Sequence, residues 1–127
     1  MPPISIGVVE PCLELLADGR LLLLVRLNGP QLWQAYSSTG GRTWSTLAPA
    51  RAADGGAPPG AVWPQLLRLS NNALVVASGR YLQLATLLGQ SGGIGLWVSP
   101  DGTGESWYQH DVIAEHNAHV SRRISII

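Results

Sequence analysis

The sequence predicts an all-β chain built from two consecutive four-stranded antiparallel sheets, and three observations support this prediction. Apolar runs alternate with turn signals along the 127 residues, which is the pattern of short strands. The segment beginning at Pro11 is repeated by the segment beginning at Pro64. Residues 36–44, YSSTGGRTW, are also matched by residues 98–107, VSPDGTGESW. A chain that repeats its strands and its turns in the same order contains two copies of one structural unit.

Each copy opens with a predicted β-hairpin. In the first copy, apolar runs lie on both sides of Asp18-Gly19, and Asn71-Asn72 takes the same place in the second. Both pairs are turn formers. A helix is the alternative for residues 13–27, but the central glycine disfavours a helix and suits a hairpin. The flanking runs are almost continuously apolar, which predicts strands covered on both faces.

A third and a fourth strand complete each copy. The third strands are predicted at residues 30–38 and 93–100, and the fourth strands at residues 43–47 and 106–112. Four antiparallel strands repeated every ~40–55 residues are typical of β-propeller blades. We therefore predict a first blade at about residues 7–50, a second at about residues 60–113 and a tail at residues 114–127.

Two blades make only part of a ring. Propeller blades bury their faces against neighbouring blades, so two blades alone leave apolar faces exposed. The sequence therefore predicts a β-propeller fragment, whose ring is completed by missing blades or by another copy of the chain.

The composition argues against several classes of function. The chain has 8 basic and 8 acidic residues, whereas a nucleic-acid surface needs a basic excess. Its longest apolar runs, such as residues 21–25, are too short to span a bilayer, so no membrane segment is predicted. His116 and His119 have a spacing that suits a metal on a helix, but no third ligand accompanies them. We predict neither a metal site nor a cofactor, and the single Cys12 excludes an internal disulfide.

The two Ser-to-Trp segments resemble the Asp box, S-x-D-x-G-x-T-W, a repeat of sialidases and of other propellers. Thr39 stands where the aspartate belongs in the first copy, and the second copy keeps Asp101 but has one extra residue. The resemblance implies a folded turn between the third and fourth strands, with a Trp packed between blades. An Asx cap, a glycine and a large aromatic residue suit that role. We expect Trp44 and Trp107 to be mostly buried at equivalent places. The expected structural residues are Ser37, Thr39, Gly41, Thr43, Trp44, Ser99, Asp101, Gly104, Ser106 and Trp107.

Residues 7–26, GVVEPCLELLADGRLLLLVR, resemble a segment of the sialidase (neuraminidase) superfamily in which a Glu opens one strand and an Arg closes the next. In that family the Glu assists a tyrosine nucleophile, and the Arg is one of three that bind the substrate carboxylate. The resemblance therefore implies a catalytic Glu10 and a carboxylate-binding Arg26. Residues 62–80 look like the following blade. Arg80 is a further candidate for carboxylate binding, although it lies one position beyond the repeat equivalent of Arg26.

Hairpin geometry bears on the spacing of Glu10 and Arg26. A three-residue loop at residues 17–19, with its glycine in the left-handed conformation, puts Glu10 directly across from Arg26 on one face. A two-residue loop would place them on opposite faces. Without the resemblance, the two residues read as a cross-strand ion pair at the end of a sheet, which adds little stability.

The resemblance covers residues 7 to about 118, which corresponds to about two of the six blades of a sialidase propeller. It implies hydrolysis of a terminal sialic acid or a related acidic sugar in the complete propeller. Arginine would bind the sugar carboxylate and a tyrosine would be the nucleophile. The expected partner is therefore a sialylated or acidic glycan.

Several parts of that catalytic site are not expected in this chain. The acid Asp and the first Arg of the family belong to earlier blades, and we expect Tyr81 and Tyr108 to be packing residues. One alternative is a non-catalytic Asp-box propeller module that binds glycans or proteins. Another is a remnant that does not fold alone.

Overall fold

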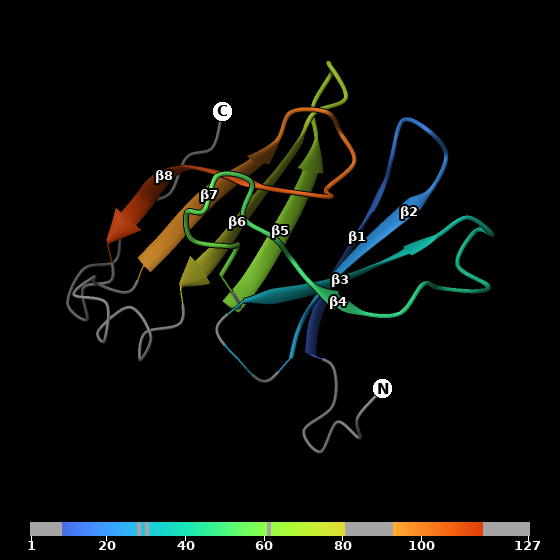
Figure 1. The fold of residues 1–127 in the computed structure, drawn as a ribbon, viewed down its shortest axis with the longest axis horizontal. Helices are drawn as coiled ribbons and strands as arrows, with labels where there is room; N and C mark the ends of the chain where they lie inside the picture. The colour runs from blue at the N-terminus through green and yellow to red at the C-terminus, as the bar shows by residue number, and fades with distance from the viewer. Residues whose placement is uncertain (1–8, 28, 30, 61, 81–92, 116–127) are drawn as a thin grey trace.

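The computed structural model describes residues 9–27, 29, 31–60, 62–80 and 93–115, which form eight β-strands and no helix. The strands are β1 (Val9–Leu15), β2 (Leu21–Arg26), β3 (Leu32–Ser37), β4 (Ala48–Pro49), β5 (Val62–Arg68), β6 (Leu74–Arg80), β7 (Gly93–Ser99) and β8 (Tyr108–Glu115). They make two antiparallel sheets, β1-β2-β3-β4 (sheet 1) and β5-β6-β7-β8 (sheet 2), which lie side by side in Figure 1. The prediction of two consecutive four-stranded antiparallel sheets is confirmed.

Several predicted features lie outside the described residues. They include Tyr81, His116, His119 and the tail from residue 116 onward. Within the described ranges, the chain has no apolar helix of a length that could cross a membrane.

The β1–β2 hairpin turns through three residues, as the spacing predicts. The Leu16 N–H donates to the Arg20 carbonyl at 2.8 Å, and Gly19 closes the loop with a φ of 92°. L side chains rarely adopt that conformation, so glycine is suited to this place. The two strands then pair in one register until a bulge near the start of β1. The β5–β6 hairpin has the same three-residue turn, with Asn72 at a φ of 72°.

A β-bulge interrupts both hairpins at equivalent places. The bulge of sheet 1 holds Glu10 at a φ of 53°, and the bulge of sheet 2 holds Trp63 at a φ of 49°. Positive φ is strained for residues other than glycine. The surrounding structure must therefore hold both residues in place.

The fourth strand of sheet 1 begins later than the sequence predicts. The prediction places it at residues 43–47, whereas β4 contains only Ala48–Pro49. Ser45 still bonds to Tyr36, through its N–H at 2.8 Å and through its Oγ at 2.9 Å. Because the Oγ replaces a backbone carbonyl there, the regular ladder starts only at Ala48.

The core lies between the two sheets. Its buried members are Leu16, Leu22, Leu24, Leu32, Ala50, Leu74, Val76, Trp97 and Trp107. From the second strand of each sheet come Leu22 and Leu24 of β2, and Leu74 and Val76 of β6. In the repeat, Leu74 corresponds to Leu21, which alternates with Leu22 and so lies on the opposite face of sheet 1.

The two sheets therefore pack head to tail. Sheet 1 contributes one face of the repeated unit to the core, and sheet 2 contributes the opposite face. We call the two faces that meet in the core the inner faces, and the other two the outer faces. β1 lies against β5 along this contact, so the first strands of the two copies are neighbours in space.

Candidate functional site

Glu10 and Arg26 meet at the end of the β1–β2 hairpin remote from its turn. Arg26 Nη1 donates a hydrogen bond to Glu10 Oε2 at 2.8 Å within an ion pair. Glu10 Oε1 accepts a second bond from the backbone N–H of Trp63 at 3.1 Å. The Glu10 side chain is 12% exposed and the Arg26 side chain is 36% exposed. The carboxylate is thus largely covered, while the guanidinium is partly open to solvent.

The bulge of β1 changes the register at this site. The predicted register places Glu10 directly across from Arg26, whereas Val9 is the partner of Arg26 in the structure. A bulge adds one residue to a strand and re-aims the side chains beside it. Glu10, in its left-handed conformation, still directs its carboxylate at Arg26. The two residues are close together as predicted, but the register is one residue off.

The geometry assigns different roles to the two partners. Within the described part of the chain, Arg26 makes its side-chain hydrogen bond through Nη1. A guanidinium carries five N–H donors in a planar fork, so an edge is left for a carboxylate that binds bidentately. Glu10 already uses both of its oxygens. The pair can therefore hold an anionic ligand through Arg26, with Glu10 fixing the position of the arginine.

Arg80, the other predicted carboxylate-binding residue, ends β6 and pairs with Gly93. Gly79 takes the place of Arg26 in the repeat, because it pairs with Val62 as Arg26 pairs with Val9. Arg80 is one position further along, and its side chain lies outside the described residues.

The second Asp-box segment forms a turn organised by Asp101. Its Oδ1 accepts bonds from the backbone N–H of Thr103 at 3.0 Å, from the Thr103 hydroxyl at 2.9 Å and from the Ser99 hydroxyl at 3.0 Å. The Ser99 Oγ in turn accepts the N–H of Gly104 at 2.9 Å. The Thr103 N–H, above all, lowers the pKa of the Asp101 carboxyl. Ser106 is half-buried just before the Trp of this segment.

The first Asp-box segment keeps this turn with Thr39 in place of the aspartate. Thr39 Oγ1 accepts the N–H of Thr43 at 2.8 Å and lies 2.9 Å from the Thr43 hydroxyl. Ser37 Oγ accepts the N–H of Gly41 at 2.9 Å, as Ser99 does for Gly104. A hydroxyl acceptor therefore supports the turn without a charge.

The two tryptophans differ in burial, and the expectation that both are mostly buried is wrong for Trp44. Trp107 is 0% exposed in the core, whereas Trp44 is 38% exposed. Trp44 Nε1 bonds to the Gly41 carbonyl of its own turn at 3.0 Å. Trp107 packs against sheet 1, where it bonds to Gln34. Trp44 lies instead beside Gly41, whose other neighbour is Leu21 of the outer face of sheet 1. Burial of this Trp thus depends on a neighbouring sheet, which a local motif does not reveal.

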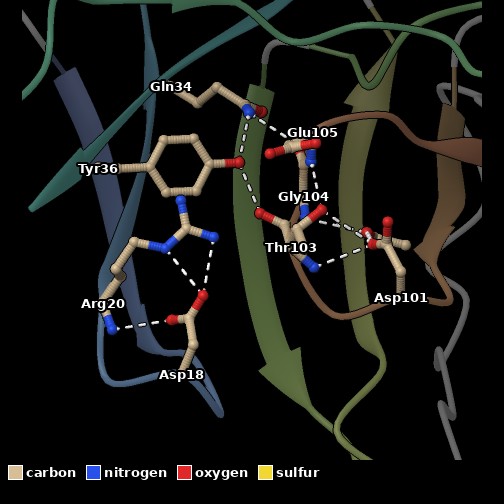
Figure 2. A network of polar contacts seen from close by, with 9 residues as sticks. Asp18, Arg20, Gln34, Tyr36, Asp101, Thr103, Gly104 and Glu105 are labelled. Atoms are coloured by element: carbon tan, nitrogen blue, oxygen red, sulfur yellow. Dashed lines mark hydrogen bonds and ion pairs between the residues drawn. The ribbon is translucent and has the colours of Figure 1, made fainter.

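A polar network joins the second Asp-box turn to sheet 1, as Figure 2 shows. Gln34 Nε2 donates to the Gly104 carbonyl at 2.6 Å, and its Oε1 accepts the Trp107 indole N–H at 3.1 Å. The Tyr36 hydroxyl donates to the Thr103 carbonyl, and burial raises the pKa of Tyr36 to about 12. The Arg20 guanidinium stacks over the Tyr36 ring at 4.6 Å. Sequence reasoning missed this network, although a Gln between the apolar Trp33 and Ala35 of a strand is a usable signal.

Glycine is required where this turn approaches sheet 1. Gly104 has a φ of 72°, and a Cβ built on it would lie 2.7 Å from Leu22 Cδ2. The buried Leu22 side chain would have to shift to admit a Cβ, and the positive φ strains any residue other than glycine.

A second glutamate of β1 also binds the backbone of β5. Glu14 Oε1 accepts the N–H of Arg68 at 2.7 Å, much as Glu10 accepts the N–H of Trp63. Two carboxylates of one strand therefore hold the edge of the next sheet. The sequence signal for this contact is two glutamates within a mainly apolar strand.

The other titratable side chains in the described part of the chain offer no further site. Cys12 is half-buried, and burial raises the pKa of its thiol to about 11, which disfavours the reactive thiolate at neutral pH. Among the residues that the structure describes, no three His, Cys, Asp or Glu side chains gather where they could hold a metal ion.

The chain matches no model of a known protein family, and a search among curated proteins likewise finds no match.

Proposed function

We propose that the chain is part of a sialidase-like propeller, in which Arg26 binds the carboxylate of a terminal sialic acid or a related acidic sugar. The observation that carries this proposal is the 2.8 Å bond between Arg26 Nη1 and Glu10 Oε2, with Glu10 also anchored to Trp63. Glu10 occupies a strained backbone conformation at this point. Strain of this kind tends to be kept where a side chain must be held for function.

Arginine is suited to this substrate because its planar fork matches a carboxylate. The partly exposed guanidinium of Arg26 offers such an edge, whereas the covered Glu10 carboxylate fixes its direction. Hydrolysis needs further groups. In sialidases the nucleophile is a tyrosine, but Tyr36 is bonded to Thr103 and its pKa is raised to about 12. We therefore assign hydrolysis to the complete propeller, with Arg26 supplying sugar binding in this chain.

A second candidate function is a non-catalytic Asp-box propeller module that binds glycans or proteins. The observation that favours it is the state of Glu10, whose two oxygens are both occupied, by Arg26 and by the N–H of Trp63. A glutamate held in this way braces the two sheets and is not free to take a proton from a nucleophile. When the ligand of the second function is a glycan, the two functions share the sugar-binding arginine and differ in the role of Glu10.

Calorimetric titration with a sialylated trisaccharide tests the proposal, with the matching neutral disaccharide as the control ligand. Arg26→Ala should weaken binding of the sialylated sugar about tenfold or more, since a charge-assisted bond contributes ~1.5–3 kcal/mol. Arg20→Ala is the matched control variant. It removes an arginine of the same hairpin that is also paired with a carboxylate, Asp18, at 2.9 Å. Equal binding of the two sugars, or binding unaffected by Arg26→Ala, would overturn the proposal.

The role of Glu10 separates the two candidate functions. Glu10→Gln keeps an oxygen acceptor but removes the charge, so sugar binding should persist. In a complete propeller that hydrolyses the sugar, the same change should abolish turnover. Turnover that survives Glu10→Gln would remove Glu10 from the catalytic machinery.

A further inference from the structure

Equivalent residues of the two copies differ in burial at the two ends of the structure. Leu16 of the first hairpin is 2% exposed in the core, whereas its repeat equivalent Leu69 is 38% exposed. The reverse holds for the tryptophans, where Trp107 of the second copy is buried and Trp44 of the first is exposed. At these positions each copy buries the residue that meets the other copy. The outer face of sheet 1 is itself covered in part, since Val25, which by strand alternation lies on it, is 0% exposed.

The outer face of sheet 1 is apolar and of the same kind as the inner face of sheet 2. It carries Leu13 and Leu15, which are 54% and 49% exposed. The strand register pairs them with Leu23 and Leu21 on the same face. Their equivalents in sheet 2 belong to the face that packs in the core. Sheet 1 therefore presents outward the kind of surface that sheet 2 buries.

The outer face of sheet 2 is mainly apolar and of the same kind as the inner face of sheet 1. Leu67 is 53% exposed and pairs with Val75, which is 9% exposed, and the exposed Gln65 lies on the same face. Tyr108 is also exposed, and it pairs with Val98 of β7. In the repeat, Val75 corresponds to Leu22, which lies in the core on the inner face of sheet 1.

The hydrogen-bonding groups of the two outer faces are also compatible with a contact between them. When Ser99 is aligned with Ser37, the residues of β7 that replace Gln34 and Tyr36 are Leu96 and Val98. The outer face of sheet 2 thus lacks the Gln acceptor that Trp107 uses on sheet 1. Trp44 needs no such acceptor, because its indole N–H already bonds to the Gly41 carbonyl. An outer face bearing Trp44 can therefore dock on Leu96 and Val98 without leaving a buried donor unpaired.

We propose that the outer face of sheet 1 docks onto the outer face of sheet 2 of a second copy of this chain, head to tail. The contact repeats the arrangement already present between the two sheets of one chain. The two docking faces belong to different sheets. A copy that uses one of them in a first contact therefore still has the other one uncovered. Such heterologous contacts produce a closed ring or an open row of copies. This inference does not depend on sugar binding.

Sedimentation equilibrium of the 127-residue chain over a wide concentration range tests the proposal. The apparent mass should reach at least twice that of one chain, and the melting temperature should rise with concentration, because association stabilises the folded state. A folded chain that stays monomeric at all concentrations would overturn the proposal. So would a chain that stays unfolded at all of them.

Two variants distinguish head-to-tail docking from symmetric docking. Leu15→Arg blocks the outer face of sheet 1, and Leu67→Arg blocks the outer face of sheet 2. Each variant alone should be monomeric. An equimolar mixture should form a dimer and nothing larger, because one intact face of each kind remains. A variant that dimerises on its own, or a mixture that stays monomeric, would contradict head-to-tail docking.

Three further variants keep this test interpretable. Ser70→Arg places the same charge at the exposed tip of the β5–β6 hairpin, away from both outer faces. It should associate like the unaltered chain. Leu15→Ser and Leu67→Ser repeat the mixing experiment with a milder change if either arginine variant fails to fold. Circular dichroism of each variant and of the mixture shows whether the sheets are formed.

Discussion

The indole Nε1 of Trp107 donates a hydrogen bond to Oε1 of Gln34 at 3.1 Å, and both side chains are buried. Gln34 Nε2 donates in the opposite direction to the Gly104 carbonyl of the same turn. One side chain of sheet 1 thus both accepts from and donates to one turn of sheet 2. Because these bonds are shielded from water, the turn and the sheet are expected to separate only when the two sheets come apart.

Replacement of Trp107 tests how much this contact stabilises the fold. Trp107→Ala should lower the free energy of unfolding by ~3–5 kcal/mol, since it leaves a cavity and an unpaired Gln34 oxygen. Urea unfolding at one fixed protein concentration measures the loss. Trp63→Ala is the matched control, because Trp63 is 71% exposed, and it should change stability by less than ~0.5 kcal/mol. Similar losses for the two variants would contradict the prediction.

The sequence was sufficient to predict the two hairpins and the order of their strands. Asp18-Gly19 and Asn71-Asn72 mark turns by their chemistry, and Gly19 and Asn72 indeed adopt positive φ. The length of the first loop also predicts that Glu10 and Arg26 lie at the same end of the hairpin, although it is the bulge that directs the Glu10 carboxylate at Arg26. These features depend on neighbouring residues, so local patterns reveal them.

The features that the sequence did not reveal depend on tertiary contacts. The bulges place Glu10 and Trp63 at positive φ, although neither residue type favours that conformation. The exposure of Trp44 follows from the absence, among the described residues, of a sheet that covers it. The role of Gln34 depends on a distant turn, because its partner Gly104 is 70 residues further along the chain. Spacing within one copy carries no information about these contacts.

Glu14 should stabilise the contact between β1 and β5. Glu14→Leu removes the acceptor of the Arg68 N–H, and leaving that donor unpaired should cost ~1–3 kcal/mol. Glu14→Gln keeps an oxygen acceptor and should lose clearly less. Chemical unfolding of the two variants beside the unaltered chain measures both effects. The assigned role of Glu14 is wrong if the Leu variant is as stable as the Gln variant.

Thr39 should support the first Asp-box turn through its hydroxyl. Thr39→Val has a similar shape but removes the acceptor of the Thr43 N–H, so we expect a loss of ~0.5–2 kcal/mol, as for a helix cap. Thr39→Ser and Thr39→Asp both provide an oxygen and should fold with stability close to that of the unaltered chain. Thermal unfolding compares the four proteins. A Val variant as stable as the Ser variant would show that the hydroxyl contributes nothing to the turn.

Tyr36 should make the stability of the fold sensitive to alkaline pH. Burial raises its pKa from 10.0 to about 12, so the folded state favours the neutral phenol. The resulting stabilisation is fully present below pH 10 and is lost as the pH rises towards about 12. Tyr36→Phe should be less stable at neutral pH by ~1 kcal/mol, for the lost bond to Thr103, but its stability should fall less steeply above pH 10.

Urea unfolding of both proteins between neutral pH and about pH 12 measures this difference. Cys12 also has a raised pKa, from 9.0 to about 11, but it is present in both proteins and cancels in the comparison. Tyr108→Phe is the matched control, because Tyr108 is exposed in β8 and takes no part in the network of Tyr36. Its unfolding curve should follow that of the unaltered chain. If Tyr36→Phe loses stability above pH 10 as steeply as the unaltered chain, the buried phenol is not the group responsible.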